Sequence, residues 1–394
     1  MNAFEALLNL SDAEKAAKGV EYTPAEIAQQ PQTWARAVDV LRARRSDIAQ
    51  FMADAGLSGN GDTTLMLTGA GTSEFVGNAI VHALRSRLKR EVQSIPTTHL
   101  VTHAAPMFVP GRPYVLLSFA RSGNSPESVA TYNAVQRACP GIRQLVITCN
   151  PNGALARAAR SDDRALCIEM PEETNDESLV MTSAFSTMAF AAIGLCFLDD
   201  LDALRTIAGQ LGAAANRIIH TCGDLLSDFA GRDFVRACFL GSNALFGAMQ
   251  ECHLKMLEMT EGRVAARFDS FLGLRHGPQV FVNDACIVVA ALSSDPRIRR
   301  YEMDMLRELK TKEQGCGTLV ICDRATDEIR AVCTSAIELF PDGVPVHDDF
   351  RVMTDVVAGQ ILGVFTSMKV GLKPDNPSAG GTINRVVQGV VIYD

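Results

Sequence analysis

Two short turns rich in glycine, serine and threonine each connect an apolar strand to a helix. The first spans 69–74 after an apolar run at 65–68, and the second spans 121–127 after an apolar run at 114–119. At such a turn, backbone N–H groups and the positive end of the helix dipole bind anions. Hydroxyl groups in the turn add neutral donors. Two such turns can converge on one phosphate, which indicates a small phosphorylated substrate.

The two turns differ in how much they predict. The first lacks the third glycine of a dinucleotide-binding turn and the Lys-Ser/Thr end of a P-loop, and Gly69 could serve only to let the helix pack closely. The second is more informative, because Ser125 (or Asn124) suits the N-cap and Pro126 the first helical position. An N-cap serine alone would not explain Ser122.

Strands and helices alternate through most of the chain, and strands that are apolar on both faces indicate parallel sheets covered by helices. The pattern starts at Thr64 and restarts near Phe234, which indicates a weak internal duplication. We expect an α/β fold of two such domains. The expected segments are a helical segment at 1–45, a phosphate-binding domain at 46–200, a catalytic domain at 201–372 and a tail over the active site at 373–394.

Within these segments, the pattern predicts single helices over 33–51 and 200–230 and an extended segment over 384–393. The second copy of the serine-rich turn has become Ser293-Ser294-Asp295, without glycine. We therefore expect the first domain to hold the phosphate and the second to supply the chemistry.

Composition excludes several classes of protein. Of 394 residues, 47% are hydrophobic and the net charge is −8, so no basic field favours nucleic acid. No apolar run is long enough for a membrane span, and the N-terminus lacks a signal stretch, so we expect a cytoplasmic protein. The eleven cysteines contain no C-x-x-C pair, which favours reduced thiols.

Two motifs in the second half carry groups suited to proton transfer. Lys255 and Glu258 are three residues apart on one helical face among apolar neighbours, although a solvated ion pair has the same spacing. His276 precedes Gly-Pro in a turn, where it either bonds backbone groups or acts as a neutral imidazole. His99 and His103 follow a segment, 94–98, that is expected to be a strand end or loop, so helical spacing between them is not assured. No acidic ligand pattern accompanies them, so a metal is not favoured.

These motifs together resemble the sugar isomerase (SIS) domain family over nearly the whole chain past residue 45. The sequence looks like the isomerase half of glucosamine-6-phosphate synthase, and more closely like the galactosamine-6-phosphate deaminase branch, also labelled tagatose-6-phosphate ketose/aldose isomerase. The segments typical of this branch are 257–266, 275–278, 374–377 and 384–389.

The resemblance implies a role for each matching residue. Glu258 would move a proton between C1 and C2, with Lys255 beside it. His276 would assist ring opening in the partner subunit's site, which implies a homodimer. The synthase has a tail lysine where this chain has Gln388. The residues expected to bind the substrate and its phosphate are Gly71, Thr72, Ser73, Arg121, Ser122, Asn124, Ser125, Thr182, Ser183 and Gln388.

The expected reaction converts galactosamine 6-phosphate to tagatose 6-phosphate and ammonia, without metal, nicotinamide or pyridoxal. The chain has no glutaminase domain, which favours release of ammonia over its incorporation. A tagatose-6-phosphate isomerase and a glucosamine-6-phosphate deaminase remain open. Alternatives of another class are a sugar-phosphate sensor, since single SIS domains serve regulators, and an amidotransferase partner subunit using external ammonia.

Overall fold

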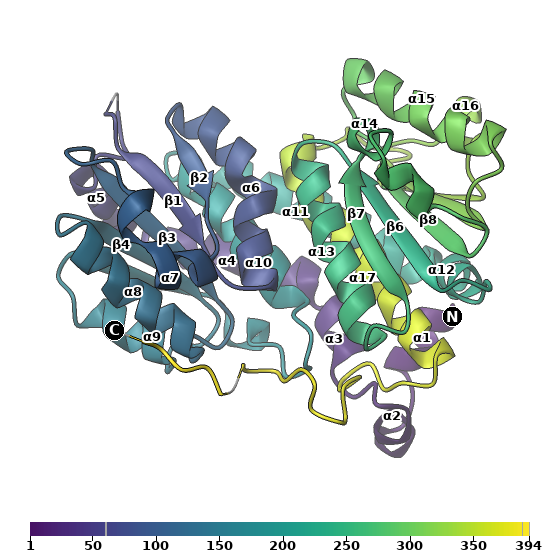
Figure 1. Cartoon of the computed structure of the whole chain (residues 1–394), viewed down its shortest axis with the longest axis horizontal. Coiled ribbons are helices and arrows are strands. Elements are labelled where there is room, and N and C mark those ends of the chain that lie inside the picture. Colours follow the sequence, from purple (N-terminus) through teal and green to yellow (C-terminus); the bar gives the residue numbers. More distant parts are fainter. Residues whose placement is uncertain (60, 388, 394) are drawn as a thin grey trace. The chain divides into compact units, whose positions relative to one another are not determined.

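The computed structural model describes residues 1–59, 61–387 and 389–393 (Figure 1). The chain divides into two compact units, each built around one sheet. The front unit contains residues 32–176, 183–208 and the described residues of 383–394. The rear unit contains residues 1–31, 177–182 and 209–382. Each unit thus takes segments from distant parts of the chain.

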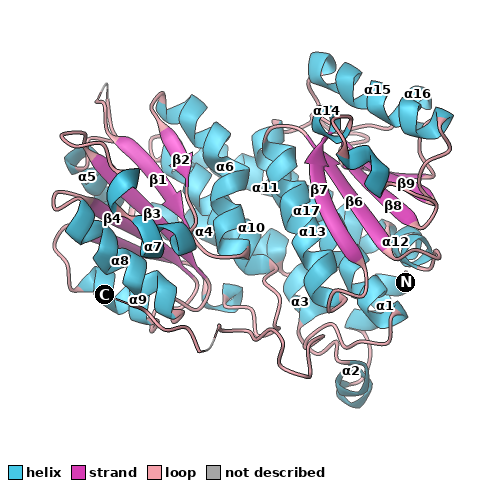
Figure 2. Cartoon of the chain, viewed as in Figure 1, coloured by secondary structure: helices cyan, strands magenta, loops and turns pink. Residues whose placement is uncertain are grey.

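The front unit contains a five-stranded parallel sheet in the order β2-β1-β3-β4-β5 (Figure 2). Its central strands are buried along their whole length, as expected for a sheet covered on both faces. The strands are β1 Thr64–Thr68, β2 Val92–Ser94, β3 Tyr114–Ala120, β4 Arg143–Thr148 and β5 Ala165–Glu169. The helices are α4 Gln30–Ala43 (from Gln32 on), α5 Arg45–Asp54, α6 Thr72–Leu88, α7 Thr97–His103, α8 Pro126–Ala138, α9 Ala154–Arg160 and α10 Ser183–Gly194, with short η1 Ala105–Met107, η2 Glu172–Thr174 and η3 Leu195–Phe197.

The rear unit has a second five-stranded parallel sheet, in the order β10-β9-β8-β6-β7. Read from β7, this is the same order as in the front sheet. The strands are β6 Arg236–Gly241, β7 Ala265–Ser270, β8 Cys286–Ala291, β9 Gly317–Cys322 and β10 Ser335–Glu338. The helices are α1 Ala3–Leu8, α2 Asp12–Lys18, α3 Thr23–Ala28, α12 Gly223–Ala230, α13 Ala244–Met259, α14 Phe271–Leu274, α15 Pro296–Thr311, α16 Asp327–Arg330 and α17 Asp348–Lys369, with short η4 Pro278–Phe281. The helix α11 Leu201–Thr221 runs from the front unit's residues into those of the rear unit.

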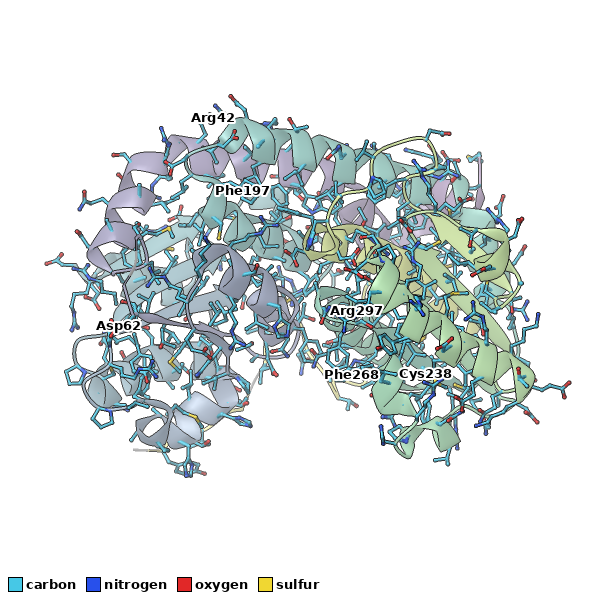
Figure 3. The ribbon with its side chains drawn as sticks, turned by 90° about the horizontal axis from the view of Figure 1, so that it is seen from above. Arg42, Asp62, Phe197, Cys238, Phe268 and Arg297 are labelled. Carbon is cyan, nitrogen blue, oxygen red and sulfur yellow. The ribbon has the colours of Figure 1, made fainter. Side chains whose placement is uncertain are left out.

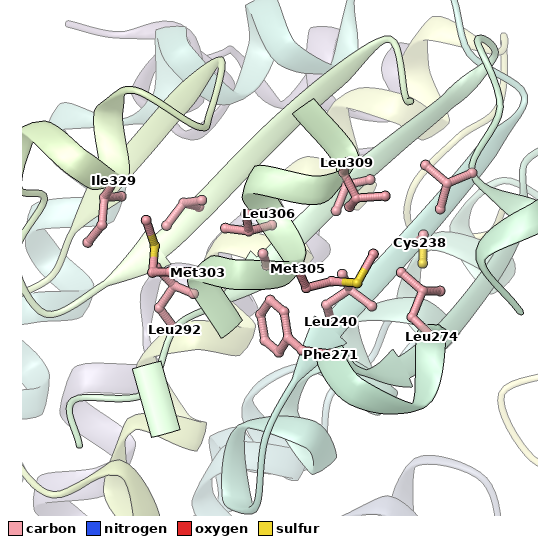
Figure 4. Packing of buried hydrophobic residues seen from close by; sticks show 14 of the residues in the cluster. Cys238, Leu240, Phe271, Leu274, Leu292, Met303, Met305, Leu306, Leu309 and Ile329 are labelled. Atoms are coloured by element: carbon pink, nitrogen blue, oxygen red, sulfur yellow. The ribbon is translucent and has the colours of Figure 1, made fainter. Parts of the chain in front are cut away.

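The apolar core of the rear unit lies between α15 and its sheet (Figure 4). Met303, Met305, Leu306 and Leu309 of α15 pack with Leu240 of β6, and all five are buried. Burial of such side chains contributes roughly 1.5–3 kcal/mol each. This packing fixes α15 over the sheet.

Helix α13 is held closely on two sides. A Cβ at Gly359 of α17 would lie 2.3 Å from the Cys252 sulfur of α13, so only glycine permits this approach. On the other side, the ring of Phe268 in β7, labelled in Figure 3, lies 4.7 Å from the ring of His253 and 5.3 Å from that of Phe246. These contacts fix the helix that carries Lys255 and Glu258.

Several expectations about local structure were wrong. The helix predicted over 33–51 is two helices, α4 and α5, interrupted at Arg44, and the one predicted over 200–230 is interrupted at Cys222. The segment 94–98, expected to be a strand end or loop, does contain the end of β2 at Ser94, but α7 already begins at Thr97, so His99 and His103 lie one turn apart. The described residues of 384–393, predicted as an extended segment, belong to neither a helix nor a strand.

None of the eleven cysteines is in a disulfide, as predicted. Within the described part of the chain, no helix is both long and apolar enough to cross a membrane.

Candidate active site

The first turn leaves β1 and opens α6. Its N-cap residue Gly71 has φ 57° and ψ −129°, a conformation that favours glycine. A Cβ at Gly69 would lie 2.3 Å from the Ser73 carbonyl, so glycine is also needed where strand and helix meet. Thr72 and Ser73, the first residues of α6, are buried at this turn.

The second turn leaves β3, the neighbour of β1 in the sheet. Since the carboxyl ends of parallel neighbours lie at one edge of a sheet, both turns lie at the same edge. They are also linked, because Thr97 donates from its backbone N–H (2.8 Å) and its hydroxyl (3.1 Å) to the Gly69 carbonyl, while Thr131 of α8 donates to the Thr97 carbonyl (3.2 Å). The two turns therefore lie side by side at one edge of the front sheet.

Hydrogen bonds from other elements hold the second turn. The N-cap of α8 is Ser125, as predicted, and its hydroxyl lies 2.7 Å from that of Ser128. Asn124 accepts the N–H of Ala154 (3.0 Å), the first residue of α9, and Asn150 donates to the Ser122 carbonyl (2.8 Å). The Asn124 side chain thus shapes the turn, a role that the sequence did not suggest.

The Asp176 carboxylate holds Ser183 at the start of α10. Asp176 is buried and accepts from the Ser183 hydroxyl (2.5 Å) and from the N–H of Ala184 (3.0 Å), so it caps α10. Thr182, also buried, belongs to the rear unit, where its carbonyl accepts from Gln360 of α17 (3.4 Å).

Part of the C-terminal tail forms hydrogen bonds with the second turn and with the backbone of Asn175 and Asp176 in the front unit. Arg385 donates to the carbonyls of Asn175 (2.9 Å) and Asp176 (2.6 Å), and its own carbonyl accepts from Arg121 at 2.5 Å. Arg121, which the sequence predicts to bind phosphate, thus donates one hydrogen bond to the tail. Gln388 lies outside the described residues.

Beyond Gln388, the tail residues 390–393 line a cavity of about 860 Å³ with residues of α7 and α8. The end of the tail therefore lies along α7 and along α8, the helix that follows the second turn.

On α13, Lys255 lies between two carboxylates. Its ammonium is 2.5 Å from Oε2 of Glu258 and 3.2 Å from Oε1 of Glu251, and neither Lys255 nor Glu251 has exposed side-chain surface, whereas that of Glu258 is 23% exposed. Burial disfavours the charged lysine, but the two carboxylates outweigh it and raise the Lys255 pKa. Lys255 thus stays charged and fixes Glu258, which remains reachable by a substrate.

The side chain of His276 lies exposed in the turn after α14, and the His276 backbone N–H donates to the Gly273 carbonyl (2.9 Å). The turn is braced from α15, because Glu308 accepts from Arg275 (2.7 Å) and from Gln279 (3.1 Å). The hydrogen bond from Lys312, followed by those from Arg275 and Gln279, lowers the Glu308 pKa to about 2. The imidazole is therefore presented outward on a rigid turn.

The predicted residues thus fall into two groups. The front unit holds Gly71, Thr72, Ser73, Arg121, Ser122, Asn124, Ser125 and Ser183, and the rear unit holds Thr182, Lys255, Glu258 and His276. Sequence reasoning missed Glu251, Asp176 and Arg385. Glu251 could have been found from its i,i+4 spacing to Lys255, whereas Asp176 and Arg385 have no such local signal.

Comparison with known proteins shows the family of the chain. The model of the SIS domain matches residues 61–195, which contain both turns. An Escherichia coli protein named D-galactosamine-6-phosphate deaminase AgaS is 36% identical over 375 residues, which cover 94% of this chain and 95% of the relative. The chain belongs to the SIS-domain family, in its AgaS group.

Solved structures of SIS-domain proteins extend the likeness to the whole fold. The tagatose-6-phosphate ketose/aldose isomerase of Escherichia coli has a TM-score of 0.85 at 34% identity, covering 94% of this chain and 96% of that one. A structure from Clostridium novyi has a TM-score of 0.94 at 31% identity and covers 98% of both chains. The two sheets are therefore two tandem SIS domains.

Proposed function

We propose that this SIS-domain protein is a galactosamine-6-phosphate deaminase, which converts its substrate and water to tagatose 6-phosphate and ammonia. The observation that carries the proposal is the ion pair of Lys255 and Glu258, in a chain that aligns almost end to end with a relative of that name. Two hydroxyl-rich turns at one sheet edge support a phosphorylated substrate.

The proposed chemistry needs only acid and base. Opening the sugar ring exposes an aldehyde, which acidifies the C2 proton. Glu258 removes this proton and returns it at C1, the C2 amine becomes an imine, and water hydrolyses the imine to ketone and ammonia. A positioned base contributes about 10²–10⁴-fold in rate. Lys255 would keep the carboxylate in place, and His276 would assist ring opening.

The phosphate would be bound by Gly71, Thr72, Ser73, Ser122 and Ser125. It is remote from the reacting carbons, so its binding energy can orient the sugar chain for proton transfer. Thr182, Ser183 and Gln388 would contact the sugar, and Arg121 would act by holding the tail.

An aldose–ketose isomerase is the second candidate, because a solved relative bears that name. Its reaction uses the same proton shift and differs only in the C2 substituent. Incubation with galactosamine 6-phosphate, glucosamine 6-phosphate and tagatose 6-phosphate, following ammonium and sugar products, distinguishes the candidates. We expect ammonium from galactosamine 6-phosphate. Isomerised tagatose 6-phosphate without ammonium from either amino sugar would favour the isomerase.

We further propose a cytoplasmic homodimer in which His276 serves the partner subunit's site. The support is its exposed position on a braced turn. Mixed dimers of Glu258→Gln and His276→Ala chains should regain part of the activity that each homodimer lacks. No recovery in such mixtures would refute a shared site.

A further inference from the structure

The rear sheet has its own version of the two anion-binding turns. Strands β6 and β8 are neighbours, as β1 and β3 are, and each is followed by a turn and a helix. Asn243, the N-cap of α13, has φ 51° and ψ −123°, close to the 57° and −129° of Gly71. A Cβ at Gly241 would lie 2.3 Å from the Leu245 carbonyl, as one at Gly69 would from Ser73. The turn after β6 therefore has the same geometry as the turn after β1.

The turn after β8 differs from an open anion-binding turn, because its N–H and O–H donors bind side chains of the chain itself. The Ser293 N–H donates to Oε2 of Glu302 (2.8 Å), and the Ser293 hydroxyl to Oδ2 of Asp348 (2.6 Å). The Ser294 N–H lies 3.0 Å and 3.1 Å from the two Asp348 oxygens. Glu302 and Asp348 thus accept the hydrogen bonds that, in an anion-binding turn, would go to a bound ligand.

Asp348 is held as a charged group. Burial disfavours its charge, but Arg351 and the donors of Ser293 and Ser294 outweigh burial and hold the Asp348 pKa below its usual range. Arg351 has no exposed side-chain surface and lies 3.3 Å from Asp348 and 2.8 Å from Asp355. Arginine and serine donors around one carboxylate resemble the surroundings of a bound anion.

We propose that the turn after β8 is an anion site filled by the chain's own Asp348 carboxylate, so that each chain takes up one sugar phosphate, in the front unit. The number of one sugar phosphate per chain rests on the proposed function. The occupation of the rear turn by Asp348 does not depend on it. The rear unit thereby keeps the architecture of a binding domain without an open site.

Chemical rescue of Asp348→Gly in the full chain tests the filling. Because glycine has no side chain, the substitution leaves an empty space where the carboxylate was. Formate can enter that space. We expect Asp348→Gly to unfold at a lower temperature than the unaltered chain, and formate, but not chloride at equal ionic strength, to raise its Tm saturably.

Two controls define the result. Asp348→Asn fills the same space without charge, and Asp349→Gly removes the next carboxylate, which pairs with His347 (3.2 Å). Formate should raise the Tm of neither beyond its effect on the unaltered chain. An equal effect of formate on all four proteins would overturn the proposal.

Binding of labelled inorganic phosphate to the unaltered chain by equilibrium dialysis provides a second measurement, independent of any variant. We expect one phosphate per chain, bound more weakly by Ser122→Ala. Two per chain would show that the rear site is open and overturn the proposal. No binding would overturn the front phosphate site, and with it the count of one, while the rescue experiment would still decide the filling of the rear site.

Discussion

The Lys255 ammonium lies 2.5 Å from the Glu258 carboxylate and has no exposed surface. A buried cation thus contacts a partly exposed anion on one helical turn. Glu251, buried on the preceding turn, supports the cation from the other side. The arrangement presents one carboxylate at a fixed position to a substrate.

Replacing Glu258 with glutamine should lower kcat by about 10²–10⁴-fold, because the amide cannot accept a proton. The KM should stay within a few-fold, since shape is conserved. Steady-state ammonium release measures both constants. Glu261→Gln, three residues further on, is the matched control and should retain the unaltered rate. A Glu258→Gln enzyme with normal kcat would remove Glu258 from its proposed role.

Lys255→Met should destabilise the protein by about 3–5 kcal/mol, because it leaves Glu251 charged, buried and without its cation. The double variant Glu251→Gln/Lys255→Met removes that charge and should recover much of the loss, although not the activity. Urea unfolding of Lys255→Met, Glu251→Gln, the double variant and the unaltered chain gives the coupling energy. Additive losses from the two substitutions would contradict this account of the cluster.

Ser122→Ala should raise the KM for a phosphorylated sugar, with a loss of about 1–3 kcal/mol if a bond to a charged phosphate is removed. The effect on kcat should be smaller. Ser161→Ala, on an exposed serine at the end of α9, is the control and should leave KM unchanged. An unchanged KM in Ser122→Ala would exclude a phosphate contact of its hydroxyl.

Asn243→Gly should stabilise the protein by about 1 kcal/mol, because φ 51° with ψ −123° strains any residue with a Cβ. Gly71→Ala, at the matching position of the front unit, should destabilise it by about 1–3 kcal/mol. Urea unfolding measures both changes. If Asn243→Gly were destabilising, the Asn243 side chain would have to contribute more than the strain costs.

Glu302→Gln should make stability less sensitive to pH. Burial raises the Glu302 pKa from 4.5 to about 7. The folded chain therefore binds this proton more tightly than the unfolded chain, so stability falls as pH rises from about 4.5 through 7. Glutamine still accepts from Ser293 and removes this loss. The variant should gain up to about 3 kcal/mol over the unaltered chain at pH 8, and little at pH 4.5. Tm measured across this range tests the prediction, and parallel Tm curves would contradict it.

The sequence predicted the buried strands and the turns that follow them because both features are local. Strand β7, with the residues Ala-Ala-Arg-Phe-Asp-Ser, was missed since an edge strand is only partly buried and lacks the apolar run of a central one. The continuous helix expected over 33–51 failed because apolar spacing carries across the interruption at Arg44.

For the site, spacing on one helix placed Lys255 with Glu258. Hydrogen bonds between segments that are far apart in the sequence leave no local pattern from which they could be predicted. Asp348 is 55 residues from Ser293, and Arg385 is 209 residues from Asp176. Such contacts depend on how the elements pack, which the spacing of residues does not encode.

The most direct test is a time course of the full-length protein with galactosamine 6-phosphate, in which ammonium and tagatose 6-phosphate are measured in the same samples. We predict equal amounts of the two products with the unaltered chain and neither with Glu258→Gln. Absence of both products with the unaltered chain, or their formation at the same rate by Glu258→Gln, would contradict the account.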